Sequence, residues 1–457
     1  MARVDEPSPS TGGVPSPDAG VVADDGPGFP PSEEENLSPA AVAAAERVAL
    51  ATSPEIMSDS LGAYAQSWFA RVRGGESGIL PVVGGLLLIS ILFQSLNHHF
   101  LTAENLVNLL IQAAVFMLLA MSEVFALLLG EIDLSIGFVS GIGGIITAEL
   151  VKQNYHWSWW AAMAAALIAC AAIGFLQGTI ITRVGLPSFV VTLAGLLGWQ
   201  GVMLLILGKG GALPINDKVI NDLASAQLTA TVSWIVVLAL VALFGIMTWM
   251  RDSRRRGSGL VAPPASLTVV KILAVLAAGV VVVLICNTNR GRGKVVIRGL
   301  PWVALIVLAV LVLWTFLLGR TRFGRYIYAI GGNPEAARRA GVSLAWIRTF
   351  GFTLAGFTAG IAGIIYASQL RSVSTALDGG QLVLYAVAAA VIGGTSLFGG
   401  RGKAAHAVLG GLVIAAIANG MGLQGYSAAA QYTVTALVLL AAVTIDALAR
   451  RGRTTGR

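Results

Sequence analysis

The stretch PWVALIVLAVLVLWTFLLG, residues 301–319, decides the fold class, because none of its nineteen side chains is charged. A helix needs roughly 20 predominantly apolar residues to cross the hydrocarbon core of a bilayer. Eleven more stretches come close to this pattern, so we predict an all-α, polytopic transmembrane helical bundle with about 12 spans. The predicted spans are residues 78–94, 107–129, 134–151, 157–181, 188–207, 230–250, 267–286, 301–319, 349–370, 382–398, 405–423 and 428–448.

The composition of the whole chain excludes a soluble globular protein. Of its 457 residues, 56% are hydrophobic and only 12% are charged, and the mean hydropathy is +0.79. Soluble domains carry about 25% charged residues, so this chain must meet lipid over most of its surface. The two cysteines, Cys170 and Cys286, both fall in apolar stretches, where we expect small core residues and no disulfide.

Charge divides the chain into a tail and a membrane domain. Residues 1–60 contain eleven acidic and two basic residues, which gives a net charge of −9. Such a segment cannot bury enough apolar surface to fold, so we predict a disordered, acidic cytoplasmic tail. A juxtamembrane segment at 61–77 then leads into a membrane domain at 78–448. A basic cytoplasmic C-terminal tail follows at 449–457.

Basic residues predict the orientation in the cell membrane. Arginine clusters follow the sixth, eighth and twelfth spans, at 251–256, 320–348 and 450–457, and Arg71 and Arg73 precede the first. Cytoplasmic loops carry an excess of Lys and Arg, so both termini and the loop at 320–348 are predicted to be cytoplasmic. We do not interpret the basic charge as nucleic-acid binding. The orientation requires an even number of spans, and ten is the alternative to twelve.

The first distinctive motif is Gly130-Glu131-Ile132-Asp133-Leu134-Ser135-Ile136-Gly137, which joins two apolar runs with almost no loop. An acidic side chain at the bilayer centre costs about 2.5–3.5 kcal/mol on insertion scales, so such residues face a protein interior or a water-filled path. The predicted residues of a helix break beside the pathway are Gly130, Glu131, Asp133, Ser135 and Gly137. The alternative is a tight cytoplasmic turn with its acids among the lipid headgroups.

A second motif, Gly393-Gly394-Thr395-Ser396-Leu397-Phe398-Gly399-Gly400, aligns with the first without gaps. The two share Gly, Leu and Gly at their first, fifth and eighth positions. Transporters are often built from internal repeats, with the substrate near the repeat interface. The match raises the hypothesis of an internal repeat whose copies run in the same direction. It adds Gly393, Gly394, Thr395 and Ser396 to the predicted pathway residues.

The third motif lies in the cytoplasmic loop, at Asn333-Pro334-Glu335-Ala336-Ala337-Arg338-Arg339-Ala340-Gly341. Asn333 and Pro334 can start a short helix, and Gly341 can end it. Ala336, Ala337 and Ala340 would make this helix slim enough to dock deeply in a partner's groove. The alternative is a solvated basic loop. The predicted docking residues are Asn333, Pro334, Glu335, Ala336, Ala337, Arg338 and Gly341.

These motifs together resemble the permeases of bacterial ABC importers, and their sugar branch in particular. The resemblance covers about residues 78 to 448, and the extra apolar pair at 230–286 is most similar to the xylose-type permeases. The stretches that carry it are Ile132-Asp133-Leu134-Ser135, Gly185-Leu186-Pro187-Ser188-Phe189-Val190, Thr321-Arg322-Phe323-Gly324-Arg325-Tyr326, Gly331-Gly332-Asn333-Pro334-Glu335-Ala336-Ala337, Gly393-Gly394-Thr395-Ser396 and Asn419-Gly420.

The resemblance implies a membrane-spanning permease subunit of an ATP-driven importer, for a monosaccharide and most closely a pentose such as xylose. It implies four kinds of partner: an ATP-binding cassette subunit, an extracytoplasmic sugar-binding protein, a second copy of this chain, and membrane lipid. No Gly-x-x-x-x-Gly-Lys-Ser/Thr loop is present, because the strings around Lys209 and Lys403 lack the final hydroxyl residue. We therefore expect a transport subunit and not an enzyme, with no cofactor or metal bound by this chain. ATP and Mg would bind to the partner.

Two alternatives remain open on the sequence. A permease of the same superfamily for a branched-chain amino acid or a nucleoside is one, and an ion-driven secondary transporter with Glu123, Glu131 and Asp133 as a proton relay is the other. Polar residues inside the spans should face other helices or a cavity, because lipid offers them no partners. These residues are Gln112, Glu123, Gln177, Gln200 and Asn419. Gln200 and Asn419 are also candidates for the substrate path, with helix–helix hydrogen bonding as the alternative role.

Overall fold

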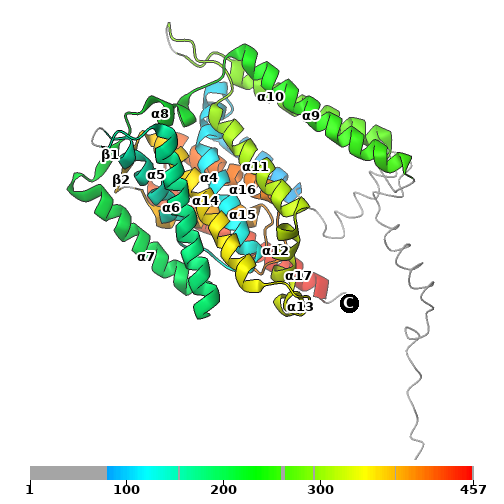
Figure 1. Cartoon of the computed structure of the whole chain (residues 1–457). Helices are drawn as coiled ribbons and strands as arrows, with labels where there is room; N and C mark the ends of the chain where they lie inside the picture. Colours follow the sequence, from blue (N-terminus) through cyan, green and yellow to red (C-terminus); the bar gives the residue numbers. More distant parts are fainter. Residues whose placement is uncertain (1–79, 153–154, 259–262, 292–293, 376, 455–457) are drawn as a thin grey trace, which may run out of the picture. The chain divides into compact units, whose positions relative to one another are not determined.

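The computed structural model describes residues 80–152, 155–258, 263–291, 294–375 and 377–454. The predicted acidic tail at 1–60 and the juxtamembrane segment at 61–77 lie outside the described residues, as do the last three residues of the basic C-terminal tail. The remainder is a helical bundle, so the predicted fold class is confirmed (Figure 1).

Each predicted span corresponds to one helix. Eight described helices are long and apolar enough to cross a membrane, and α3, α5, α15 and the first part of α17 are shorter apolar segments. The helices are α3 (Leu80–Leu96), α4 (Ala103–Leu128), α5 (Ile136–Leu150), α6 (Trp159–Thr179), α7 (Ser188–Leu207), α9 (Ala230–Gly257), α10 (Ala265–Asn287), α11 (Trp302–Arg320), α14 (Leu344–Leu370), α15 (Gly379–Ile392), α16 (Ala404–Leu423) and α17 (Ala428–Thr454).

Four helix ends differ from the predicted bounds by five residues or more. Two of them are the ends of α9 and α17, which continue to Gly257 and Thr454 beyond the predicted 250 and 448. The span predicted at 382–398 ends as α15 at Ile392, because Gly393 and Gly394 turn the chain and Gly394 has a φ of 87°. The span predicted at 349–370 begins earlier, as α14 at Leu344. Its first turn is therefore part of the loop that was predicted to be cytoplasmic.

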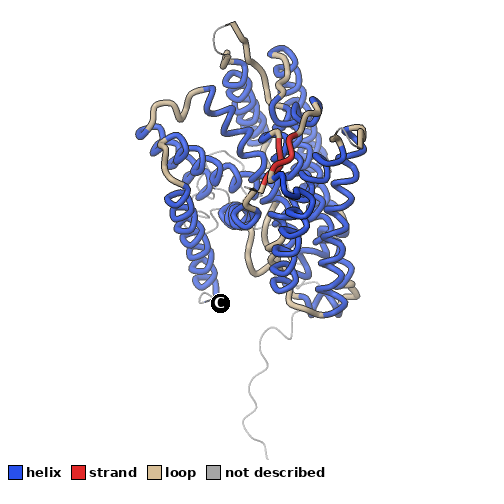
Figure 2. Tube along the Cα trace, turned by 90° about the vertical axis from the view of Figure 1, so that its left-hand side faces the viewer, coloured by secondary structure: helices blue, strands red, loops and turns tan. Residues whose placement is uncertain are grey.

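Short elements connect the spans. They are the π-helix η2 (Ile180–Val184), the 3-10 helix η3 (Gly208–Gly210), β1 (Ala212–Pro214), α8 (Lys218–Ser225), α12 (Arg322–Gly332), α13 (Pro334–Arg339) and β2 (Ser372–Ser374). The strands β1 and β2 pair antiparallel, with Leu213 opposite Val373. Figure 2 shows these strands side by side against the helices.

The core of the bundle is α4 with α14, α5 and α6 packed together (Figure 1). Glycines let the backbones of these helices approach closely, which compensates for the lack of a hydrophobic driving force between helices in lipid. A Cβ at Gly363 of α14 would lie 1.7 Å from Ser140 O of α5. A Cβ at Gly174 of α6 would lie 2.1 Å from Phe352 O of α14. The abundant glycine therefore occupies helix–helix contacts.

The helices α9 and α10 pack mainly on each other, at one edge of the bundle (Figure 1). The Asp252 carboxylate is fully buried between them, where it accepts hydrogen bonds from Thr268 Oγ1 at 2.9 Å and Arg251 Nε at 3.0 Å. This hairpin is the extra apolar pair at 230–286.

Candidate functional site

The three sequence motifs meet at one end of the bundle, beside the C-terminus of α4. Gly400 N of the second motif donates a hydrogen bond of 2.9 Å to Leu128 O. A Cβ at Gly331, just before the third motif, would lie 1.8 Å from the same Leu128 O. A Cβ at Gly399 would lie 2.7 Å from Gly331 O and 2.9 Å from Gly130 N. Backbone therefore meets backbone at this point.

Three of these glycines are needed for their backbone conformation as well. Gly130, Gly399 and Gly400 have φ values of 77°, 86° and 71°, in the left-handed region that side chains disfavour. Both motifs follow helices whose C-termini lie at the same end, which agrees with the predicted common direction. Their surroundings differ, because the first motif joins the long α4 to the short α5 and the second joins the short α15 to the longer α16.

The first motif contains the predicted helix break. The chain leaves α4 at Leu128 and becomes helical again at Ile136. Asp133 is only 1% exposed, and its Oδ1 accepts hydrogen bonds from Ser135 N at 2.9 Å and Ser135 Oγ at 2.6 Å. Asp133 is therefore buried inside the bundle, with donors from the break itself.

A polar network extends from this carboxylate into two other helices. Asp133 N donates to Glu123 Oε1 of α4 at 3.3 Å, and Ser135 Oγ lies 3.0 Å from Gln177 Oε1 of α6. Among the described residues, Glu123 Oε2 and Gln177 Nε2 are buried without a hydrogen-bond partner. Because buried polar groups are nearly always paired, the network retains capacity for water or a substrate hydroxyl.

Glu131, next to this network, pairs with Arg348 in the first turns of α14. Arg348 Nε lies 3.4 Å from Glu131 Oε1, and both side chains are mostly buried, although the angle is too poor for a hydrogen bond. The pair borders a cavity of about 600 Å³ that also includes Arg338 of α13 and the Gly185–Ser188 turn. The first motif is thus in contact with the elements that adjoin the third.

The second motif is held from both sides. Ser396 N donates to Arg401 O at 2.8 Å, and Tyr328 of α12 donates its hydroxyl to Gly402 O at 2.8 Å. Gly393 approaches α16, because its Cβ would lie 2.2 Å from His406 O. Thr395 is 1% exposed, and within the described part of the chain its hydroxyl is buried without a partner.

The third motif forms the predicted short helix, α13. Asn333 Oδ1 accepts from Ala336 N at 3.0 Å and caps it, Pro334 occupies the first turn, and Gly341 follows its end with a φ of 80°. Glu335 and Arg338 pair with each other at 3.2 Å on the exposed side. Of the three alanines in the predicted docking helix, Ala337 is buried against the bundle.

The candidates inside the spans have different roles. Asn419 of α16 accepts from Asn105 Nδ2 of α4 at 2.8 Å and donates to Gln112 Oε1 at 3.3 Å, so it joins two helices. Gln200 is half-buried on α7. The facing of Gln112, Glu123, Gln177 and Asn419 toward other helices is confirmed. Cys170 and Cys286 are buried and free, as predicted.

Sequence reasoning missed a contact at the start of α15. The N-termini of α5 and α15 meet, because a Cβ at Gly137 would lie 1.8 Å from Gly379 O. Asp378 caps α15 by accepting from Gln381 N at 3.0 Å. The signal for this turn was Asp378-Gly379-Gly380, which stands just before a predicted span. Discontinuous helices that meet inside the membrane are typical of transporter substrate sites.

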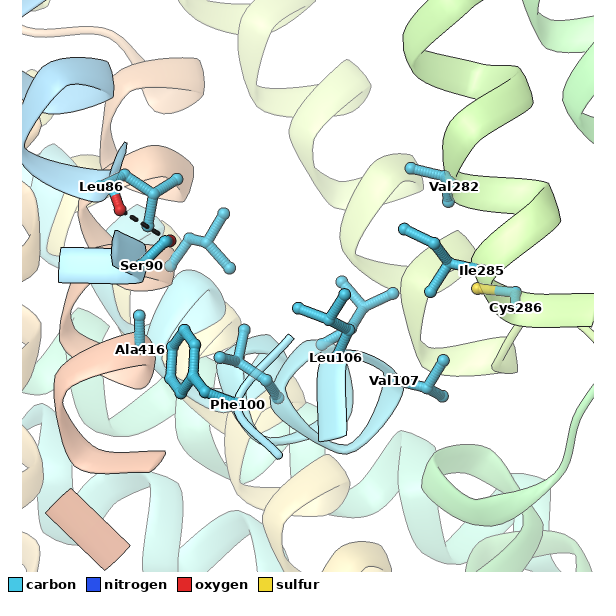
Figure 3. Close-up of a pocket in the computed structure, with 12 residues that line it drawn as sticks. Leu86, Ser90, Phe100, Leu106, Val107, Val282, Ile285, Cys286 and Ala416 are labelled. Carbon is cyan, nitrogen blue, oxygen red and sulfur yellow. Dashed lines mark hydrogen bonds between the residues drawn. The ribbon is translucent and has the colours of Figure 1, made fainter. Parts of the chain in front are cut away.

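A separate pocket of about 220 Å³ lies between α10 and the helices α3, α4 and α16 (Figure 3). Its lining is apolar apart from Ser90 and Cys286, and Ser90 Oγ already donates to Leu86 O at 2.8 Å. This pocket contains none of the predicted site residues. Within the described residues, no group of three or more His, Cys, Asp or Glu side chains could hold a metal ion.

Comparison with known proteins agrees with this geometry. The family described as branched-chain amino acid transport system / permease component matches residues 105–443. The xylose transport system permease protein of Escherichia coli (strain K12) is 32% identical over 388 residues, which cover 84% of this chain and 95% of that protein.

Two other relatives carry different sugar names. The D-allose transport system permease protein of E. coli K12 is 29% identical over 79% of this chain and 90% of its own length. The ribose import permease protein of the same strain is 30% identical over 79% of this chain and 91% of its own length. No solved structure matches the chain. Because the family match covers most of the membrane domain, the chain belongs to the family described as branched-chain amino acid transport system / permease component.

Proposed function

We propose that this chain is the membrane-spanning permease subunit of an ATP-driven importer of a monosaccharide, with a pentose such as xylose as the first candidate. The relatives named for xylose, D-allose and ribose support a sugar over the branched-chain amino acids of the family description. The observation that carries the proposal is the meeting of the three motifs at Leu128–Gly130, where a cytoplasmic helix pair contacts the break between α4 and α5.

This arrangement explains how movement at the surface reaches the interior. The exposed helix α13 continues directly from α12, and α12 touches the end of α4 through Gly331. On its other side α13 leads into α14, which pairs through Arg348 with Glu131 of the break. A partner that pulls on α13 therefore acts on both sides of the break at once. Such a contact suits an ATP-binding subunit.

The partners follow from this function. An ATP-binding cassette subunit docks on α13 in the cytoplasm and holds the ATP and Mg. An extracytoplasmic sugar-binding protein delivers the substrate to the opposite face, and a second copy of this chain completes the path. In this orientation both termini are cytoplasmic, which agrees with the arginines at the end of α9 and in the loop between α11 and α14.

Uptake measurements test the proposal. The chain is co-expressed with the genes beside its own in cells that lack their own pentose importers, and uptake of radiolabelled D-xylose, D-ribose, D-allose and L-leucine is measured. We expect uptake of at least one of these sugars, which requires the chain and survives a protonophore while cellular ATP is maintained. Uptake of L-leucine without any sugar would reject the proposal, and loss of sugar uptake with the protonophore would indicate an ion-driven carrier.

A further inference from the structure

A pocket of about 460 Å³ lies between α15 and the N-terminal part of α17. Eight described residues line it, and five of these are polar: Asp378, Gln381, Tyr385, Tyr432 and Thr435. Small-molecule sites have volumes of roughly 300–1,000 Å³ and combine an apolar wall with a few convergent polar groups. Most of the accessible lining surface is nevertheless apolar, so the size and lining of this pocket suit one small ligand that has both an apolar face and polar groups.

The polar groups have hydrogen-bonding capacity to spare. The Gln381 side-chain amide donates a hydrogen bond to the Tyr385 hydroxyl at 2.5 Å. The O–H of Tyr385 is therefore available to donate a hydrogen bond to another acceptor. Asp378 Oδ1 accepts one bond, from Gln381 N. An ionised carboxylate has about four lone-pair sites, so it can accept further bonds from a ligand. Donor and acceptor groups thus lie along the same wall.

The lining distinguishes between the substrate classes of the family. Among the described residues that line the pocket, none is Lys, Arg or His, so the described lining offers no basic partner for the carboxylate of an amino acid. The positive N-terminal end of α15 is already neutralised by its cap, Asp378. A sugar needs no such partner, because its hydroxyls both donate and accept. Tyr432 is 47% exposed and offers an aromatic face on which the C–H face of a sugar ring can pack.

The position of the pocket connects it to the moving parts of the membrane domain. Gly380, which also lines it, follows Gly379 at the contact between the N-termini of α5 and α15. The first motif, with its buried Asp133, precedes the same end of α5. A ligand in the pocket is thus beside the junction of the two short helices.

We propose that this pocket is a monosaccharide subsite of the translocation path. Asp378 accepts hydrogen bonds from ring hydroxyls, Tyr385 donates one, and Tyr432 packs against the ring. This inference rests on the proposed function, because it assigns the place at which the imported sugar contacts the chain.

Variants that change one polar group at a time test it. Asp378→Asn keeps a good helix cap but removes the charge. Tyr385→Phe removes only the hydroxyl. Each should lower the initial rate of D-xylose uptake by about fivefold or more, the effect of losing one hydrogen bond. Thr435→Val, inside the pocket, should lower it less, and Thr433→Val is the matched control, because its hydroxyl bonds to Ala429 O of its own helix outside the pocket.

Folding and assembly are measured on the same complexes. Apparent melting temperature and co-purification of the ATP-binding subunit should match the wild type for all four variants. If Asp378→Asn, Tyr385→Phe and Thr435→Val all import D-xylose like Thr433→Val, the subsite is refuted while the permease function stands. If the wild-type chain imports L-leucine and none of the sugars, both proposals fail together.

Discussion

Substitution of Gly331 by alanine tests the contact through which α12 holds the end of α4. Gly331 is helical and has no left-handed backbone angle, so alanine adds a methyl group without conformational strain. The new Cβ would lie 1.8 Å from Leu128 O and 2.4 Å from Gly400 N, which are backbone atoms that cannot turn aside. The methyl group must therefore separate Gly400 from Leu128 or push α12 away from α4.

The expected magnitude follows from three contributions. Overpacking of a tight contact costs about 1–3 kcal/mol. Loss of the hydrogen bond from Gly400 N to Leu128 O adds about 1 kcal/mol. Replacement of glycine by alanine in a helix gains about 1 kcal/mol. The net loss is therefore about 1–3 kcal/mol.

Gly332→Ala is the matched control, because it lies next to Gly331 in α12 and nothing lies within 4 Å of its Cβ. The measurements are the apparent melting temperature in detergent and the sugar-stimulated ATPase activity of the assembled complex. Gly331→Ala should melt several degrees lower and lose stimulation, while Gly332→Ala should match the wild type in both. Equal behaviour of the two variants would show that the meeting of the motifs does not couple the surface to the break.

Three further predictions concern the same region. Asp133→Ala leaves the buried donors of its break unpaired, at about 1–3 kcal/mol each, so uptake should fall sharply; wild-type uptake would contradict a role for this carboxylate. Gly341→Trp should prevent co-purification of the ATP-binding subunit without affecting membrane insertion, and Glu335→Lys should weaken it less; unchanged co-purification with Gly341→Trp would reject α13 as the docking element. Glu131→Arg and Arg348→Glu should each uncouple ATP hydrolysis from uptake, and the double variant, which restores opposite charges, should recover part of the coupling. If the double variant recovers none, the ion pair does not couple ATP hydrolysis to uptake.

The sequence predicted the helices well because their signal is local. Twenty apolar residues in a row form a transmembrane helix whatever surrounds them, and the break at Asp133 was visible as acids and glycines between two such runs. The short helix α13 was predictable for the same reason, since Asn333, Pro334 and Gly341 each act within one turn. The burial of Ala337 could not be predicted from the sequence, because it depends on how α13 packs on the bundle.

The arrangement of the site could not be read from the sequence. Leu128, Gly331 and Gly400 lie far apart in the chain, and no local pattern indicates that their backbones touch. The contact between Gly137 and Gly379 is of the same kind. Asp378 was missed because its turn adjoins a long apolar run, in which one acid and two glycines are a weak signal.

The contact between α5 and α15 has a consequence for how this transporter can change over time. At Gly137 the backbone of α5 meets the backbone of α15 directly, because a Cβ there would lie 1.8 Å from Gly379 O. The ring of Phe138, next to Gly137, packs on Gly379 at the same place, so the contact consists of backbone and one apolar ring and has few interlocking side-chain shapes that must separate when one helix slides over the other. Its chemistry is also the same whatever cargo passes. The side chains around the contact between α5 and α15 can therefore be exchanged for a new cargo while this contact stays as it is.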